Sequence, residues 1–248
     1  MNYLLTLMFD GSYFHGWQTQ KNAYSVQENL EDAIEKLFGE RVRVQGCSRT
    51  DAGVHARSFK ANFSTQKEMP CETVISGLNF FLHEAVSVQT CVTVPDAFNA
   101  RFDCASKEYE YVFYVGRERN PFYKNRASHV KHALDVPLMD REAKCFLGTH
   151  DFSAFCAAGS SVLSNVRTVT EAEVTARGDL VVFRVRADGF LYNMVRIMAG
   201  TLLYISEGKI PPGEIPAILS SKDRTLAGKT APPEGLYLNQ VFYKEGSL

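Results

Sequence analysis

The stretch Gly46-Cys-Ser-Arg-Thr-Asp-Ala-Gly-Val-His-Ala56 is the most informative part of the sequence. It lies between two segments with strand character, 42–46 and 56–63, so it is expected to form the loop that joins them. Within this loop Arg49 supplies a guanidinium and Asp51 a carboxylate, which serves as a nucleophile or general base in many active sites. Asp and Gly are also the residues that ordinary turns prefer. Both a catalytic loop and a plain connecting turn therefore fit these residues.

The residues around this loop predict a first half that mixes strands with two helices. A nearly continuous apolar run at 3–9 favours a buried strand. The pattern Ser25-Val-Gln-Glu28 is typical of a capping box, and apolar residues then recur at helical spacing up to Gly39. The remaining elements of this half are a helix at 72–82 and a strand at 86–94.

The second half has the same mixture of elements. Its expected strands lie at 107–115, 166–176, 180–187 and 236–243, and its expected helices at 139–147, at 190–207 and after the proline pair 211–212. No linker of low complexity separates the halves. We therefore expect an α+β fold built of two related α/β subdomains, 1–100 and 101–248, that share a sheet.

Composition limits the possible functions. The chain has 248 residues, of which 45% are hydrophobic, and its 27 Lys and Arg nearly balance 28 Asp and Glu. The high apolar fraction and the balanced charge exclude a mainly disordered chain, and the charge balance also excludes a uniformly basic coat for nucleic acid. The start lacks the charged region of a signal peptide, and no apolar run approaches the ~18 residues of a membrane span. The six cysteines include no C-x-x-C pair and no zinc-site spacing. We expect a cytoplasmic protein without disulfides, structural metal or membrane span.

The segment Arg49–His55 resembles the active-site motif of the tRNA pseudouridine synthase A family. Further motifs match the same family in its order along the chain, so the resemblance covers nearly the whole sequence. These motifs are Phe9-Asp-Gly-Ser12, Gly16-Trp-Gln18, Ser25-Val-Gln27, Phe98-Asn-Ala-Arg-Phe102, Lys107-Glu-Tyr-Glu-Tyr111, Gly189-Phe190, Met194-Val-Arg196, Gly200, Lys222-Asp-Arg224, Thr230-Ala-Pro-Pro233 and Gly235-Leu236.

The resemblance implies an activity and a fold. Enzymes of this family isomerise uridine to pseudouridine in tRNA, at positions 38, 39 and 40 of the anticodon stem-loop, and they need no cofactor or metal. Their fold pairs two α+β subdomains around a mixed, mainly antiparallel sheet with a central basic cleft, and members are usually homodimers. A uridine stacked in RNA hides its reacting atoms, so the base must be flipped out of the stack into a pocket.

The resemblance also assigns roles to three residues. Asp51 matches the catalytic aspartate, which attacks the nucleotide at C1′ of the sugar or at C6 of the base. Arg196 matches the arginine that pairs with this carboxylate, and Tyr109 matches the tyrosine that stacks on the flipped base. The residues around Arg196 agree, because Asn193, Arg196 and Gly200 share one lane of a mostly apolar helix, where a cation needs a partner. A structural partner for Arg196 and a core position for Tyr109 are the alternatives.

RNA-binding residues are expected near the catalytic loop and in the second half. The candidate substrate-binding residues, besides Tyr109, are Arg49, Arg101, Lys107 and Arg224. Residues 101–131 hold seven basic residues against four acidic ones, with Phe122 and Tyr123 placed to stack on bases. A solvated charged loop would give the same pattern. Because residues 1–100 carry 8 Lys and Arg against 11 Asp and Glu, the basic surface is expected mainly from the second half.

Two other functions fit parts of the pattern. A non-catalytic RNA-binding module of the same fold would not require the pair of Asp51 and Arg196. A hydrolase that cleaves glycosides or nucleosides would use paired carboxylates, and no convincing second acid accompanies Asp51. Within the loop, His55 is expected to be a structural hydrogen-bonding residue, while Trp17 is expected in a packed or RNA-facing loop.

Overall fold

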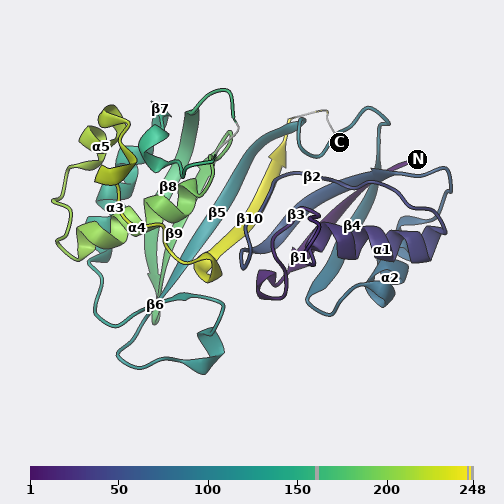
Figure 1. The fold of residues 1–248 in the computed structure, drawn as a ribbon, viewed down its shortest axis with the longest axis horizontal. Helices are drawn as coiled ribbons and strands as arrows, with labels where there is room; N and C mark the ends of the chain where they lie inside the picture. Colours follow the sequence, from purple (N-terminus) through teal and green to yellow (C-terminus); the bar gives the residue numbers. More distant parts are fainter. Residues whose placement is uncertain (160–161, 245, 247–248) are drawn as a thin grey trace. The chain divides into compact units, whose positions relative to one another are not determined.

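The computed structural model describes residues 1–159, 162–244 and 246. Contacts between residues divide the chain into two compact units. The first comprises Met1–Ala105 together with Tyr237–Leu248, and the second comprises Ser106–Leu236. The C-terminal segment therefore returns to the unit that contains the N-terminus, and each unit combines strands with helices (Figure 1).

The first unit is an antiparallel sheet to which the last strand is added in parallel. Its strands are β1 (Asn2–Phe9), β2 (Gln45–Gly46), β3 (His55–Ser64), β4 (Val86–Val94) and β10 (Leu236–Tyr243), and its helices are α1 (Val26–Phe38) and α2 (Cys71–Phe81). β1 lies between β4 and β3 and pairs antiparallel with both. Ala56, the second residue of β3, lies opposite Phe9 of β1 on one edge and Leu238 of β10 on the other. β3 is thus held on both edges where the Asp51 loop ends.

Helix α1 begins and ends where the sequence predicts. The Ser25 hydroxyl accepts a hydrogen bond from the Glu28 backbone N–H at 3.1 Å, and Gly39 ends the helix in the left-handed conformation, with φ 69°. On the buried side, the Phe38 ring packs against Tyr3 of β1 and Phe63 of β3, with centroid distances of 6.1 and 5.6 Å. These contacts fix α1 on the sheet.

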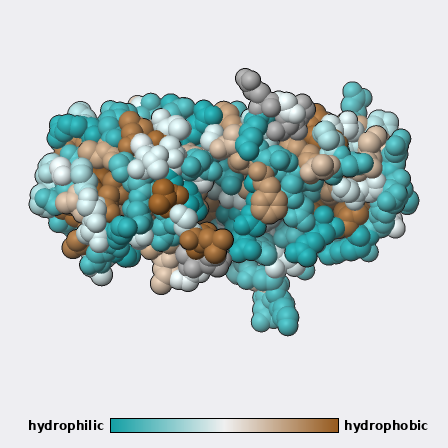
Figure 2. Space-filling model, turned by 90° about the horizontal axis from the view of Figure 1, so that it is seen from above, coloured by the Kyte–Doolittle hydropathy of each residue, from teal (hydrophilic) through white to brown (hydrophobic). Residues whose placement is uncertain are grey.

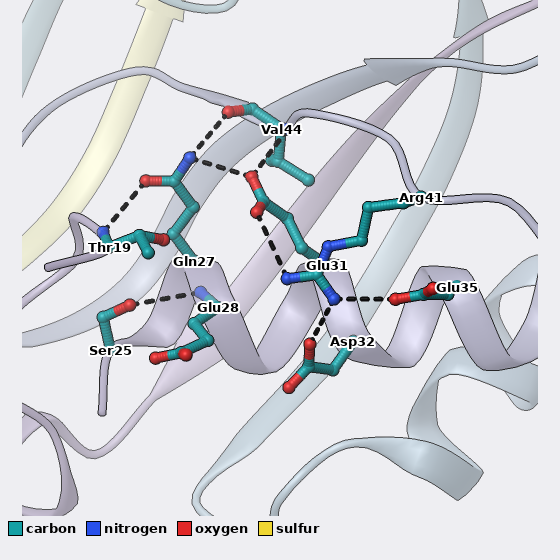
Figure 3. A network of polar contacts seen from close by, with 9 residues as sticks. All are labelled: Thr19, Ser25, Gln27, Glu28, Glu31, Asp32, Glu35, Arg41 and Val44. Carbon is teal, nitrogen blue, oxygen red and sulfur yellow. Dashed lines mark hydrogen bonds and ion pairs between the residues drawn. The ribbon is translucent and has the colours of Figure 1, made fainter. Parts of the chain in front are cut away.

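Two buried polar side chains of α1 hold the segment that leads into the Asp51 loop (Figure 3). Gln27 accepts a hydrogen bond from the Thr19 N–H and donates one to the Val44 carbonyl. A carboxylate oxygen of Glu31 accepts from the Val44 N–H at 3.1 Å. Because side chains satisfy both backbone groups of Val44, the strand expected at 42–46 is shortened, and β2 contains only its last two residues.

The second unit is an antiparallel sheet with one short parallel strand. Its strands are β5 (Cys104–Val115), β6 (Ser128–Val130), β7 (Gly148–Asp151), β8 (Val166–Arg177) and β9 (Leu180–Ala187), and its helices are α3 (Val136–Ala143), α4 (Met194–Ser206) and α5 (Ile215–Ser221). β9 lies between β5 and β8, β7 pairs with the other edge of β8, and β6 runs parallel to β5. Phe146 packs against Phe155 and against Phe183 of β9, at centroid distances of 5.1 and 6.4 Å. These rings form part of the core of this unit.

Helix α4 begins later than the sequence predicts. The expected helix covers 190–207, whereas α4 starts at Met194. Asn193 has φ 60°, a left-handed conformation that interrupts the helical run and that asparagine tolerates better than most residues. The early part of the prediction is therefore wrong because the apolar pattern continues through a turn.

Helix α3 is displaced from its predicted position at 139–147. It begins at Val136, because the Asp135 carboxylate caps it by accepting from the Leu138 N–H at 2.9 Å. It ends at Ala143, where a 3-10 turn and then β7 follow. The sequence analysis did not predict β7.

The fold class is confirmed as α+β, with sheets that are mixed and mainly antiparallel. The described strands include two parallel pairings, β3 with β10 and β5 with β6. In the described part of the chain, no helix has both the length and the apolar character needed to cross a membrane.

We expect Ser25→Ala to lower the free energy of unfolding by about 1 kcal/mol, because the Glu28 N–H loses its acceptor at a fully buried position. Urea unfolding followed by circular dichroism measures this change. The control is Ser76→Ala, the same substitution at an exposed position inside α2, where alanine should leave stability unchanged or raise it slightly. Equal effects of the two substitutions would contradict a capping role for Ser25.

Candidate active site

The Asp51 loop ends in a tight turn that fixes the backbone of the aspartate. The Val54 N–H donates to the Asp51 carbonyl at 3.2 Å, and Gly53, at the third position of the turn, has φ 79°. A type II turn has this arrangement, and its positive φ favours glycine. Asp51 is half-buried and Arg49 exposed, whereas Val54 and His55 are buried. The turn thus places the carboxylate at the boundary between solvent and the interior of the unit.

The segment 10–17, which follows β1, packs against the backbone of this loop. Gly16 has φ 89°, and a β-carbon on it would lie 2.3 Å from the Thr50 carbonyl oxygen and 3.2 Å from the Asp51 carbonyl carbon. The Trp17 N–H donates to the same Thr50 carbonyl at 3.1 Å. Because only glycine permits this approach, Gly16 sets the position of the peptide that carries Asp51.

His55 is a structural residue of the loop, as the sequence predicts. Its side chain is almost completely buried, and its Nδ1 accepts a hydrogen bond from the Gly11 N–H at 3.1 Å. Its ring stacks on Tyr237 of β10 with centroids 4.7 Å apart. A β-carbon on Gly11 would lie 1.9 Å from the Val54 carbonyl oxygen, so this glycine also makes a close approach that no other residue allows.

Trp17 is packed inside the first unit. Its ring stacks on Phe59 of β3 at a centroid distance of 4.1 Å, and it leaves no room for a side chain on Gly46. Its carbonyl accepts from the Gln27 N–H at 3.0 Å, which connects the segment to the first turn of α1. The Asp51 loop is therefore positioned by β3, by segment 10–17 and, through that segment, by α1.

Tyr109 lies in β5 of the second unit, opposite Val185 of β9. Its ring is buried and meets Phe190 edge to face, with centroids 4.9 Å apart. Its neighbour on the same face of β5, Tyr111, donates its hydroxyl to the Pro232 carbonyl at 2.8 Å, and burial raises the pKa of this hydroxyl. The structure therefore gives Tyr111 a structural hydrogen bond within the second unit.

Arg196 lies in the first turn of α4. Its Nε donates to the Ala231 carbonyl at 2.7 Å, and one terminal nitrogen donates to the Asn193 side-chain oxygen at 2.8 Å. Gly200 approaches the same segment, because a β-carbon on it would lie 1.8 Å from the Lys229 carbonyl oxygen. Arg196 and Gly200 therefore both face the segment that contains Lys229 and Ala231, whereas Asn193, the third residue of the predicted lane, precedes the helix and contacts Arg196 through its side chain.

Arg224 contacts the neighbouring part of that segment. Its guanidinium donates to the Gly228 carbonyl at 2.9 Å and to the Thr230 hydroxyl at 3.1 Å, and burial lowers its pKa. These contacts give Arg224 a role in supporting the segment that Arg196 also contacts. A contact between Arg224 and RNA stays a prediction.

The other candidate binding residues lie closer to solvent. Arg101 is exposed, and its guanidinium lies over the Phe102 ring at 5.6 Å. Lys107 is half-buried on β5, opposite Ala187. With the exposed Arg49, these side chains are available to an anionic partner, and their contact with RNA also stays a prediction.

The structure describes the candidate residues as two groups, one in each unit. Asp51, Arg49 and Arg101 belong to the first unit, and Tyr109, Lys107, Arg196 and Arg224 to the second. The roles of Gly16 and Asn193 in positioning Asp51 and Arg196 were not predicted from the sequence. A glycine before a tryptophan, and an asparagine at the start of an apolar helix, were the available signals. Among the described residues, no group of three or more His, Cys, Asp or Glu is arranged to hold a metal ion.

Comparison with known proteins shows to which family of enzymes the chain belongs. A family model described as tRNA pseudouridine synthase matches residues 6–103, which include the Asp51 loop, and residues 143–244, which include α4. Among curated proteins, the tRNA pseudouridine synthase A of Ruminiclostridium cellulolyticum is 45% identical over 240 residues, covering 96% of this chain and 98% of the relative. The proteins of the same name from Thermoanaerobacter sp. and Acetivibrio thermocellus are 44% and 45% identical over 242 residues, covering 98% of this chain and 99% of each relative. The chain therefore belongs to the tRNA pseudouridine synthase A family, a family of isomerases.

We expect Gly16→Ala to slow pseudouridine formation by roughly 10- to 100-fold, because displacing a reacting group by about 1 Å is enough for such an effect. The added β-carbon must push the Thr50 carbonyl and with it the peptide of Asp51. Single-turnover assays on unmodified tRNA measure the rate.

The control for this prediction is Gly213→Ala. Gly213 also has a positive φ, 85°, but a β-carbon there would meet nothing within 4 Å. Both substitutions carry the cost of a left-handed backbone, about 1–2 kcal/mol. Equally reduced rates in the two variants would show that backbone strain, and not pressure on the loop, is responsible.

Proposed function

We propose that this chain converts uridine to pseudouridine in tRNA, at positions 38, 39 and 40 of the anticodon stem-loop. The observation that supports this most strongly is its similarity, over nearly the full length of both chains, to relatives named tRNA pseudouridine synthase A. We extend the proposal to a homodimer in the cytoplasm, which sedimentation of the protein and fractionation of cells would test.

The proposed reaction exchanges one bond of uridine for another. The bond between N1 and C1′ breaks, the base turns, and a bond between C5 and C1′ forms. The proton that leaves C5 is balanced by one taken up at N1, so the nucleotide keeps all its atoms and electrons. The protein must therefore supply a nucleophile, a path for the proton and a fixed orientation of the base.

Asp51 supplies the carboxylate that attacks the nucleotide, at C1′ or at C6. Its position supports this role, because a nucleophile needs a fixed backbone and access to the substrate. The type II turn and the contact with Gly16 fix the backbone, and the half-buried side chain is accessible to the substrate. The loop is thus organised before any substrate binds, which lowers the entropy cost of reaching the reactive arrangement.

Arg196 pairs with Asp51 in the proposed mechanism, and Tyr109 stacks on the flipped base. The hydrogen bonds of Arg196 to Asn193 and Ala231 support this role, because they set the plane of the guanidinium. A guanidinium held in one plane presents a directed pair of donors to a carboxylate. Tyr109 is held in one orientation by its edge-to-face contact with Phe190.

Removing the target base from the RNA stack costs a few kcal/mol. Contacts to the phosphate backbone must offset this cost. Arg49 and Arg101 are exposed and Lys107 is half-buried, so these cations are placed to make such contacts. Arg224 is a further candidate for such a contact, and its hydrogen bonds to Gly228 and Thr230 also support the segment that Arg196 contacts.

The direct test is to incubate the purified protein with unmodified tRNA and to map pseudouridine along the product. Pseudouridine at positions 38 to 40, formed without added nucleotide, is the expected result. If tRNA binds and no pseudouridine forms, the chain is a binding module. If uracil is released, it is a hydrolase.

We expect Asp51→Asn to abolish pseudouridine formation while tRNA affinity stays within about threefold of that of the original protein, a difference below 1 kcal/mol. The amide keeps the size of the side chain and removes the nucleophilic oxygen. Rapid-quench assays and filter binding measure the two quantities. Asp96→Asn, at an exposed carboxylate outside the loop, is the control and should keep full activity. Turnover by the Asp51 variant at more than a few per cent of normal would refute the assignment.

Arg196→Met should slow the reaction by about 100-fold or more, the scale seen when a charged group that stabilises a transition state is removed. The substitution also removes the bond to the Ala231 carbonyl, so thermal unfolding must be measured alongside the rate. Arg141→Met removes an exposed cation from α3 and is expected to leave the rate unchanged. A folded Arg196 variant with a nearly normal rate would exclude the proposed pairing with Asp51.

A further inference from the structure

The segment between β5 and β6, residues 116–127, forms a basic loop with an aromatic residue at its tip. We call it the Phe122 loop, and in Figure 1 it is the teal loop that extends beyond the strands near β6. Its basic residues are Arg117, Arg119, Lys124 and Arg126, and its one acidic residue is Glu118. All five of these side chains are exposed. The loop therefore presents a local excess of positive charge in a chain whose net charge is −1.

Hydrogen bonds within the loop give its tip one conformation. The Asn120 side chain accepts from the Phe122 N–H at 3.0 Å and begins the 3-10 turn Pro121–Tyr123. The Lys124 N–H closes this turn on the Pro121 carbonyl at 3.2 Å. The Arg126 N–H then donates to the Tyr123 carbonyl at 3.0 Å. The backbone at Phe122 is thus held in one conformation.

The base of the loop is packed by three rings. Tyr114 at the end of β5 contacts Tyr123, with centroids 4.9 Å apart, and stacks on His129 of β6 at 5.3 Å. The His129 Nε2 lies 2.7 Å from the Gly116 carbonyl oxygen, and the Tyr114 hydroxyl donates to the Glu118 carbonyl. Tyr123 thus packs at the base of the loop, whereas the Phe122 side chain is exposed to solvent.

Phe122 is 87% exposed, so its ring contributes little to the stability of the fold. The face drawn in Figure 2 is mainly hydrophilic, with brown patches that are small and separated. Single exposed apolar residues are common on protein surfaces and need no explanation. Phe122 differs because hydrogen bonds fix its backbone and because the loop that carries it contains four exposed cations. When a ring on a fixed backbone stacks on a flat partner, only its own side-chain torsions have to be ordered.

We propose that the Phe122 loop is an RNA-binding surface in which Phe122 stacks on an unpaired base while the flanking cations contact phosphates. Every base has a flat face for stacking, and the adjacent phosphates match the charge of Arg119 and Lys124. A second protein would need apolar surface around the ring, and the loop offers charge there instead. The ligand is an RNA with unstacked bases, such as a loop, and not a regular duplex. That this RNA is tRNA rests on the proposed function.

The test compares Phe122→Ala with Phe80→Ala, its matched control. Phe80 on α2 is 82% exposed and lies within residues 68–100, which contain no Lys or Arg. We expect Phe122→Ala to weaken the binding of unmodified tRNA by roughly 5- to 100-fold, the range for removing the stacking of one base. Phe122→Tyr should restore binding, because the ring is retained. Phe80→Ala should bind normally, and all three variants should unfold at the same temperature.

Salt dependence separates the charges from the ring. Replacing Arg119 or Lys124 by glutamine should reduce the slope of log affinity against log salt by about 0.7 for each phosphate of single-stranded RNA that the variant no longer neutralises. Phe122→Ala should leave this slope unchanged. A regular RNA duplex should bind the original protein and the Phe122→Ala variant with the same affinity, because its stacked bases offer no face to the ring.

Three results would overturn the inference. Normal tRNA affinity of Phe122→Ala is one, and equally weakened binding by Phe80→Ala is another. The third is a changed oligomeric state of Phe122→Ala at normal tRNA affinity, which would make the loop a contact between copies of the chain. The binding assay does not depend on catalysis, so the two proposals can fail separately. If Phe122→Ala weakens tRNA binding but the original protein forms no pseudouridine, the proposed function is refuted and the inference about the Phe122 loop stands.

Discussion

The close approach of Gly16 to the peptide between Thr50 and Asp51 is the constraint on which the first unit depends. A β-carbon at this position would lie 2.3 Å from a backbone oxygen, so the two segments can meet only through glycine. The segment that carries Gly16 is bonded through Trp17 to the first turn of α1, which is in turn packed on the sheet. The hydrophobic core of the unit thereby determines where a half-buried carboxylate is presented.

In the second unit, a close glycine contact of the same kind positions a different side chain, that of Arg196. Gly200 of α4 lets the helix approach the Lys229 carbonyl, and Arg196, one turn earlier, bonds the Ala231 carbonyl next to it. Gly228 is part of the same contact, on the segment that faces the helix. A β-carbon on it would lie 2.5 Å from the Gly200 carbonyl oxygen. In both units, a close backbone contact that only glycine permits determines the position of a charged residue, Asp51 in the first unit and Arg196 in the second. Precision of this kind comes from backbone packing, which side-chain rotation does not disturb.

Local signals explain which parts of the structure could be predicted from the sequence. Helix α1 has its own capping residue and its own terminal glycine, and β4 has turns on both sides, so both were predicted at their observed bounds. The start of α4 was not, because Asn193 interrupts an apolar pattern that continues through it. The motif around Asp51 indicated a catalytic loop, but its contact with Gly16 joins residues 35 positions apart in sequence. No periodicity or composition reports such a contact, and only the folded backbone reveals it.

The charge distribution shows why a nearly neutral chain is compatible with a polyanionic substrate. At physiological salt the field of an exposed charge is screened within about 8 Å, so RNA senses neighbouring side chains and not the sum over the molecule. Residues 68–100 contain no Lys or Arg, whereas residues 116–127 hold four such cations against one carboxylate. An acidic surface elsewhere then discourages contacts in the wrong orientation, since like charges repel at short range. Segregated charge of this kind favours some orientations of approach over others, whereas a uniformly basic surface would attract RNA without that selection.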